Sequence, residues 1–171
     1  MLTILQQIAN LIDRLNVIIG RTIAWLTIMM VLVTCIIVIA RYLFNSGSIA
    51  LQESVMYMHG TVFMLGIAFT LKEQGHVRVD VLHERLGLRA RAVIEMTGSV
   101  LFLIPVSVVI LVSSLEYVAF SWSLKESSAQ PSGLPGVYLL KTLITAMAGL
   151  LLLQGISEFI KAFNTLKKQA K

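Results

Sequence analysis

The sequence predicts an all-α integral membrane protein with four transmembrane helices. The chain has 171 residues, of which 57% are hydrophobic and 13% are charged, a composition too apolar for an ordinary soluble domain. Four long apolar runs place the predicted spans at about residues 17–40, 54–71, 96–115 and 134–157. Because roughly 20 helical residues cross a hydrocarbon core about 30 Å thick, each run is long enough to span it. Residues 1–171 are therefore expected to form a single membrane domain.

The distribution of positive charge predicts which way the helices cross the membrane. Eleven of the 14 Lys and Arg residues lie in the two terminal segments and in the loop 72–95, whereas the loops 41–53 and 116–133 carry one each. Since cytoplasmic loops are enriched in Lys and Arg, both termini and the loop 72–95 are predicted to be cytoplasmic, and the other two loops periplasmic. The net charge of +5 is then explained by anionic lipid headgroups, and nucleic-acid binding is not expected.

Residues 2–16 precede the first span and show a helical pattern of their own. Apolar residues recur on one side at the spacing of a helix, and polar residues occupy the other side. The apolar set is Ile4, Leu5, Ile8, Leu11, Ile12 and Leu15, and the polar set is Thr3, Gln6, Gln7, Asn10, Asp13 and Arg14. This pattern predicts an N-terminal amphipathic helix lying in the cytoplasmic membrane interface. The alternative is a cytoplasmic extension of the first transmembrane helix.

The connecting segments contain turn, capping and helix-breaking signals. Asn45 begins an Asn-Ser-Gly-Ser turn, and Glu53 is expected to cap the start of the second span. In the cytoplasmic loop, Asp80 is expected to cap a short interfacial helix. Pro105 lies in the middle of the third span, where it predicts a kink, and Pro135 suits the first turn of the fourth.

Few ionisable side chains lie within the predicted spans, and each such group is a candidate functional site. His59 is expected to form a hydrogen bond between helices rather than a proton relay, because no acidic partner is near it in the second span. Lys141 has three interpretations. Its long stem extends toward the outer surface, it forms an ion pair with Glu53 or Glu116, or it contacts a partner protein.

The sequence contains no recognisable catalytic, nucleotide-binding or metal-binding motif. His76, Asp80 and His83 lie close together in the cytoplasmic loop but lack a further strong ligand, so a metal site is not expected there. The spans also lack the broken helices typical of a secondary transporter. The chain is therefore expected to be neither an enzyme nor a carrier by itself, to bind no cofactor, and to pack against another membrane protein.

Several short motifs occur in an order that suggests a family. They are Arg41-Tyr42-x-Phe44-Asn45 after the first span, Glu53 at the start of the second, Gly75-His76-Val77-x-Val79-Asp80 after it, Ser132-Gly133-Leu134-Pro135 before the fourth, and Gln154 within the fourth. Together, from about residue 38 to 160, they resemble the small membrane subunit of tripartite ATP-independent periplasmic (TRAP) transporters. Gln52 departs from this resemblance, because many members have a second acid beside Glu53.

The resemblance implies a non-catalytic subunit of a sodium-coupled transporter in the bacterial inner membrane. The small subunit would be a fixed scaffold for a large subunit that moves as an elevator and holds the sodium and substrate sites, so sodium is not expected to bind this chain. A periplasmic binding protein would deliver an organic acid, such as sialic acid, a C4-dicarboxylate or a similar carboxylate. The alternative is a membrane anchor or assembly subunit of another multisubunit complex. It is disfavoured because such anchors often place paired haem-binding His residues within helices, and only His59 is intramembrane.

The resemblance also selects candidate interaction residues. Those expected on the periplasmic side, where they would stabilise loops or contact the large subunit and the binding protein, are Arg41, Tyr42, Asn45, Glu53, Ser132, Gly133, Leu134 and Lys141. His76 and Asp80 would orient the cytoplasmic loop. For all of these residues, the alternative is a purely structural role in loop geometry.

Overall fold

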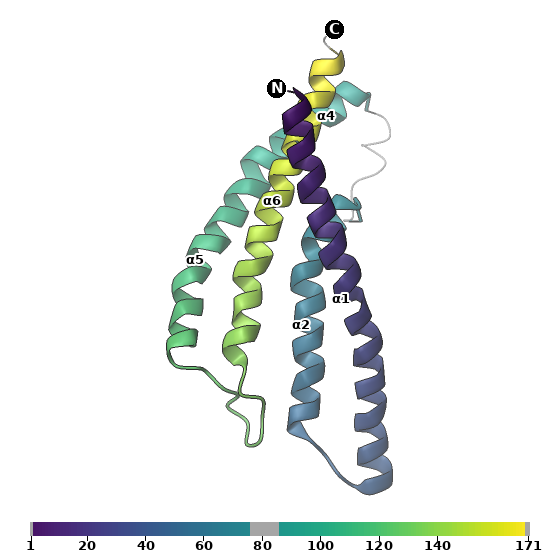
Figure 1. Ribbon diagram of the computed structural model, residues 1–171, viewed down its shortest axis with the longest axis vertical. Helices are drawn as coiled ribbons and strands as arrows, with labels where there is room; N and C mark the ends of the chain where they lie inside the picture. Colours follow the sequence, from purple (N-terminus) through teal and green to yellow (C-terminus); the bar gives the residue numbers. More distant parts are fainter. Residues whose placement is uncertain (1, 76–85, 170–171) are drawn as a thin grey trace.

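The computed structural model describes residues 2–75 and 86–169, and every element of secondary structure within them is helical (Figure 1). The elements are α1 (Leu2–Phe44), α2 (Ile49–Lys72), α4 (Leu88–Gly98), the π-helical segment η1 (Ser99–Leu103), α5 (Ile104–Ser123) and α6 (Val137–Gln169). The stretches long and apolar enough to cross a membrane are Ile4–Phe44, Ile49–Lys72, Leu88–Ser123 and Val137–Lys167. The prediction of an all-α protein with four helices of membrane-spanning length is therefore confirmed.

The helices form two antiparallel hairpins, α1–α2 and α5–α6, with α4 preceding α5 (Figure 1). α6 is the central element, because it packs against α1, α2, α4 and α5. Both ends of the chain lie near α4 at one end of the bundle, called the terminal end below, and the connections 45–48 and 124–136 lie at the opposite end, called the loop end. In Figure 1 the two hairpins are close together near the terminal end and diverge toward the loop end.

The first helix is continuous from Leu2 to Phe44, so residues 2–16 are its first turns and not a separate element. This corrects the expected separate amphipathic helix and agrees with the alternative, an extension of the first span. Part of the polar side of these turns faces the bundle, since Asp13 is half-buried and Asn16 is 1% exposed, whereas Gln7, Asn10 and Arg14 are exposed. The position of this segment in the membrane interface stays a prediction.

Several helix ends are set by residues in special backbone conformations. α1 ends before Asn45, whose φ of 48° turns the chain, and Ser48 is the N-cap of α2 because its side chain accepts a hydrogen bond from a backbone N–H of the first turn. Glu53 lies one turn further along α2, so the expectation that it caps this helix is wrong. α5 ends in a Schellman motif around Lys125, whose φ is 46°, and the Glu126 N–H donates to a carbonyl of the last turn at 3.1 Å.

Two prolines mark helix boundaries in different ways. Pro105 is the second residue of α5, and η1 ends two positions before it at Leu103. Proline has no N–H to donate to the preceding turn, so one hydrogen bond of the helix is missing at this point. The π-helical turn η1 accommodates the missing bond, and it is the distortion that the sequence predicted as a kink at Pro105. Pro135 lies before α6, since the Gly136 carbonyl accepts the first helical bonds. The prediction that Pro135 occupies the first helical turn is therefore wrong.

Small side chains fill the contacts between helices, and the large apolar side chains face outward. Alanine, serine and glycine make up most of the buried positions, whereas Trp25 is 70% exposed and Phe102 is 69% exposed. Gly20 shows why small residues are needed, because a Cβ there would lie 2.7 Å from the Cβ of Phe69 on α2. Close approach of helices through small residues is typical of packing within a membrane, where the outward apolar side chains meet lipid.

Candidate functional site

Glu53 on α2 binds the loop that joins α5 to α6, at the loop end of the bundle. One carboxylate oxygen accepts a hydrogen bond from the Ser128 hydroxyl, and the other accepts one from the Leu134 N–H at 2.6 Å. The Ser128 N–H also donates to the Leu134 carbonyl at 3.1 Å, so the loop is closed on itself. Hydrogen bonds to a charged acceptor are stronger than neutral ones. These three residues, together with Gly133, are called the loop clamp below.

The loop reaches Glu53 through a tight turn. Ser132 follows a proline and has a φ of 64°, and the Gly133 N–H donates to the Gln130 carbonyl at 3.1 Å, as in a type II turn. Gly133 lies directly against Glu53 and Ser128: a Cβ there would be 2.8 Å from Glu53 Oε1 and would overlap the Ser128 side chain. The predicted residues brought together here are Glu53, Ser132, Gly133 and Leu134.

Lys141 on α6 forms a second polar contact at the loop end, with Glu126 just beyond α5. Lys141 Nζ lies 2.5 Å from Glu126 Oε2 and 4.3 Å from the centre of the Tyr117 ring. The Ser121 hydroxyl donates to the same carboxylate oxygen at 2.6 Å. The Lys141 ammonium holds the pKa of the Glu126 carboxyl below its usual range, and the Ser121 hydroxyl adds to this effect.

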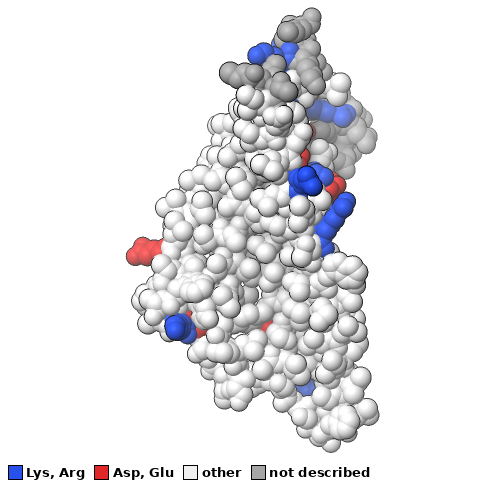
Figure 2. Space-filling model, viewed as in Figure 1, with Lys and Arg blue, Asp and Glu red and all other residues white. Residues whose placement is uncertain are grey.

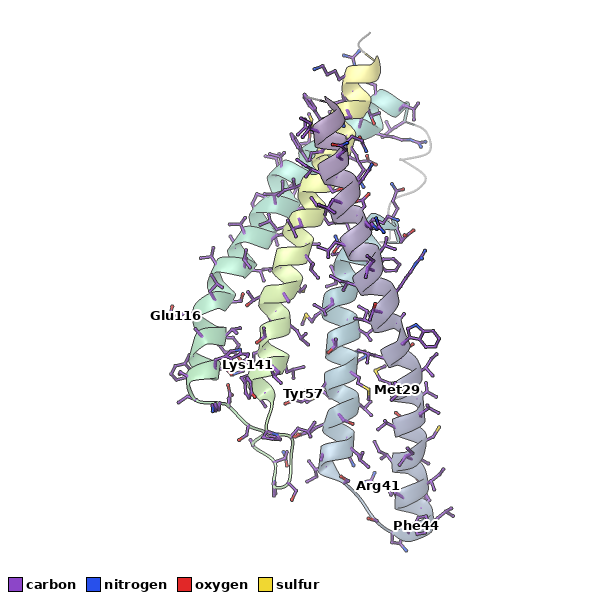
Figure 3. The ribbon with its side chains drawn as sticks, in the orientation of Figure 1. Met29, Arg41, Phe44, Tyr57, Glu116 and Lys141 are labelled. Atoms are coloured by element: carbon purple, nitrogen blue, oxygen red, sulfur yellow. The ribbon has the colours of Figure 1, made fainter. Side chains whose placement is uncertain are left out.

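This ion pair corrects the partners expected for Lys141, which were Glu53 and Glu116. Glu53 is occupied by the loop clamp, and Figure 3 shows Glu116 on the side of α5 that faces away from Lys141. Sequence spacing alone does not select Glu126, because this residue reaches α6 only through the left-handed turn at Lys125.

The remaining predicted residues lie apart from these two contacts. Arg41 and Tyr42 are in the last turn of α1, Tyr42 is 79% exposed, and Figure 3 shows Arg41 close to the α1–α2 turn. Asn45 has the positive φ that ends α1. His76 and Asp80, with the short helix expected to begin at Asp80, lie outside the described residues.

A larger polar contact, which the sequence interpretation missed, joins α1 to α6 toward the terminal end. Asp13 is its centre. Its carboxylate accepts hydrogen bonds from Gln154 Nε2 at 3.0 Å and from Ser157 Oγ at 2.7 Å, and Lys161 Nζ lies 3.1 Å from its Oδ2. Lys161 also pairs with Glu158 at 2.6 Å. One carboxylate of α1 is thus bound by three side chains from successive turns of α6.

The buried part of this contact is an amide pair. Asn16 Nδ2 donates to Gln154 Oε1 at 2.7 Å, and the two residues are 1% and 0% exposed. Gln154 uses both ends of its amide, since its Nε2 donates to Asp13 and to Glu158. The polar seam, as this contact is called below, consists of Asp13, Asn16, Gln154, Ser157, Glu158 and Lys161.

The signal for the polar seam is present in the sequence but divided between distant segments. Polar residues recur every three or four positions in both helices. They are Gln6, Asn10, Asp13 and Asn16 in α1, and Gln154, Ser157, Lys161 and Asn164 in α6. Taken alone, the first set resembles the solvated side of an amphipathic helix. Only the packing of α1 on α6 brings the two sets together, and a hydrogen bond of 2.9 Å between Asn164 and Gln6 extends the contact.

The chemistry of these contacts is that of hydrogen-bonded links between segments. No group of three or more His, Cys, Asp or Glu side chains able to hold a metal ion is found in residues 2–75 and 86–169. His59 is exposed and stacks against Phe63 with ring centres 6.3 Å apart. Within the same part of the chain, the expected hydrogen bond from His59 to another helix is not found.

Comparison with known proteins adds a family assignment to this geometry. A family model described as "Tripartite ATP-independent periplasmic transporters, DctQ component" matches residues 30–165. No curated protein and no solved structure matches the chain. The matched segment contains the loop clamp, the Lys141–Glu126 pair and the α6 side of the polar seam.

Proposed function

The chain belongs to the DctQ family, the small membrane components of TRAP transporters, and from this premise we propose that it is a non-catalytic scaffold for the large subunit. The observation that carries the proposal is the way its polar groups join its own helices. The polar seam connects α1 to α6, and the loop clamp connects α2 to the loop before α6. Helices linked in this way resist relative displacement, as a fixed support for a moving partner must.

The proposal includes an orientation in the bacterial inner membrane. The terminal end would face the cytoplasm and the loop end the periplasm, with a periplasmic binding protein docking on the loop end. The distribution of charge supports this, because Figure 2 shows most Lys and Arg side chains toward the terminal end and a largely uncharged surface elsewhere on that face. Positive charge is retained on the cytoplasmic side of membrane proteins.

The transported substrate is proposed to be an organic acid, such as sialic acid, a C4-dicarboxylate or a similar carboxylate, taken up with sodium. The large subunit would hold both the sodium and the substrate and would move as an elevator. The small subunit would contribute position and contact surface, so its own residues would affect uptake through assembly and delivery.

Uptake in bacterial cells tests this proposal. The chain is expressed alone, together with the large subunit, and together with the large subunit and the binding protein, and uptake of labelled carboxylates is measured with and without sodium. We expect copurification with the large subunit, and sodium-dependent uptake only when all three proteins are present. Uptake by this chain alone, or full uptake by the other two proteins without it, would overturn the scaffold proposal.

Labelling of single cysteines tests the orientation separately. In a Cys35→Ala background, a cysteine replaces exposed Ser127 at the loop end or exposed Lys167 at the terminal end. A membrane-impermeant maleimide added to cells with a permeabilised outer membrane should label Ser127→Cys, and Lys167→Cys should react only after lysis. The reverse pattern would reject the proposed orientation without affecting the scaffold role.

A further inference from the structure

α5 has two opposite faces, and only one of them is covered by the rest of the chain. The covered face is made of small residues against α6: Ser107, Ser114 and Ser121 are 0%, 6% and 0% exposed. The hydroxyls of Ser114 and Thr145 are hydrogen bonded across this contact at 2.9 Å. This is the close packing through small side chains that joins membrane helices.

The opposite face carries a regular stripe of exposed residues, called the outer stripe below. Its members are Val106, Val109, Ser113, Glu116, Phe120 and Ser123. The steps along it alternate between three and four residues, which is the spacing of the seam along which two helices pack side by side. Val109 is 63% exposed and Phe120 is 65% exposed, so no part of the described chain covers the stripe.

Glu116 distinguishes this stripe from an ordinary lipid-facing surface. It is exposed, Figure 3 shows it at the edge of α5 that faces away from α6, and the described residues provide neither a hydrogen bond nor an ion pair to it. It lies seven residues before Ser123, the last residue of α5, which places it about 10 Å inside the helix end. It also follows directly on Leu115, the last residue of the apolar run 96–115, so it lies at the outer edge of the third span, where an ionised side chain beside lipid calls for a partner.

The surface around Glu116 is also slightly hollowed. A shallow groove is present here, and its lining consists of Ser113, Glu116, Tyr117, Ala119, Phe120 and Ser123. Serine at two positions of the stripe lets a neighbouring helix approach closely and offers hydroxyl groups beside the carboxylate. Lipid tails supply neither a cation nor a hydrogen-bond donor to this groove.

We propose that the outer stripe of α5 is the docking surface for a transmembrane helix of the large subunit, and that this helix presents a Lys or Arg side chain to Glu116. The inference rests on the proposed function, which supplies the partner. Charge complementarity selects the occupant, because an exposed carboxylate beside the apolar residues of the stripe is satisfied by a cation on the facing helix.

Photo-crosslinking in the assembled complex tests the location. A benzoylphenylalanine probe replaces Val109 on the outer stripe or, as a matched control, Val31 on α1, since these residues are 63% and 62% exposed. Val109 should give an adduct with the large subunit, and its yield should exceed that from Val31. Absence of an adduct from Val109, in a complex that copurifies normally, would overturn the docking proposal and leave the scaffold role intact.

Charge reversal tests the proposed ion pair. Glu116→Lys should reduce copurification of the large subunit by about tenfold or more, because like charges would then face each other, and Glu116→Gln should reduce it less. Glu73→Lys, at an exposed acid near the end of α2, serves as the control and should leave copurification unchanged. A Lys→Glu or Arg→Glu change on the facing helix of the large subunit should restore binding to Glu116→Lys.

The outcomes separate the two proposals. Normal copurification of Glu116→Lys would reject the ion pair. Failure of the wild-type chain to copurify with the large subunit would reject the scaffold role itself, and the docking surface with it. Because Glu116 has no partner in the described chain, its variants should fold like the wild type, and equal thermal unfolding of the isolated subunits checks this.

Discussion

The polar seam and the loop clamp use the same chemistry in different surroundings. In each, a carboxylate on one helix accepts hydrogen bonds from a distant segment: Asp13 from α6, and Glu53 from the loop before α6. The seam lies between packed helices, and Gln154 in it is 0% exposed. The clamp residues are only half-buried, at the edge of the bundle. Water can replace a lost partner at the edge, whereas a buried group left without a partner keeps its desolvation cost.

This difference separates the stability of the bundle from the shape of its surface. The seam joins the first helix to the last, through residues as far as 138 positions apart in the sequence, Asn16 and Gln154, so the two hairpins stay together while it is intact. The clamp joins a helix to a loop, and its loss frees only that loop. We therefore expect changes in the seam to affect the whole fold, and changes in the clamp to affect local structure at the loop end.

The largest effect is expected from removing the acceptor at the centre of the seam. Asp13→Ala leaves Gln154, Ser157 and Lys161 without their common partner, and should lower the free energy of unfolding by roughly 3 kcal/mol. Asp13→Asn keeps one acceptor oxygen and should lose less. Unfolding in mixed micelles, followed by far-ultraviolet circular dichroism, measures both variants. A loss below about 1 kcal/mol for Asp13→Ala would contradict the idea that the seam holds the bundle together.

The clamp is expected to respond locally to overpacking. Gly133→Ala places a methyl group against Glu53 Oε1 and the Ser128 side chain, and should cost about 2 kcal/mol in the opening of the loop 124–136. Gly47→Ala is the matched control, because nothing lies within 4 Å of a Cβ there. Protease cleavage of the loop should rise in Gly133→Ala alone, with the global unfolding transition unchanged. Equal cleavage in both variants would show that the clamp does not hold the loop.

The buried amide pair allows a sharper measurement within the seam. Asn16→Leu and Gln154→Leu each leave a polar group of the other residue without its partner, so the double variant should lose less stability than the sum of the two single variants. A coupling of about 1 kcal/mol is expected, near the values measured for hydrogen bonds between membrane helices. Additive losses would indicate that the two amides contribute independently.

The smallest effect is expected at the Lys141–Glu126 pair, which lies at the solvent-accessible edge. Because the pKa of Glu126 is lowered by Lys141 and Ser121, the ionised carboxyl stabilises the loop end at every pH above the ordinary glutamate pKa of about 4.3. This contribution should be lost as the pH falls through the lowered pKa of the folded protein. Hydrogen exchange of residues 124–136 should therefore separate wild type from Glu126→Gln at pH 7, and the two should converge once the pH is below the lowered pKa of Glu126. A difference that stays constant as the pH falls from 7 to well below the ordinary glutamate pKa would exclude this ion pair as the cause.

Many residues of the candidate site could be predicted from the sequence, and the incorrect predictions have physical causes. Glu53 and the segment Ser132–Leu134 were selected as separate motifs, and the structure joins them in one clamp. Ser128 was missed because an isolated serine in a loop carries no pattern. The partner of Lys141 was wrong because a left-handed turn after α5, and not helical spacing, brings Glu126 to α6.

The sequence by itself determined the four helices that are long and apolar enough to span a membrane, because the length and apolar character of a run are properties of a single segment. It also contained enough ordered motifs to indicate the family, which the match over residues 30–165 confirms. Only the tertiary structure decided which polar side chains face each other. The first turns of α1 have the pattern of a helix whose polar side meets water, yet Asp13 and Asn16 on that side pack on α6, because hydrogen-bonding partners more than 130 residues away satisfy them. Helical periodicity indicates that one side of a helix is polar. The packing decides whether water or another helix provides the hydrogen-bonding partners of that side.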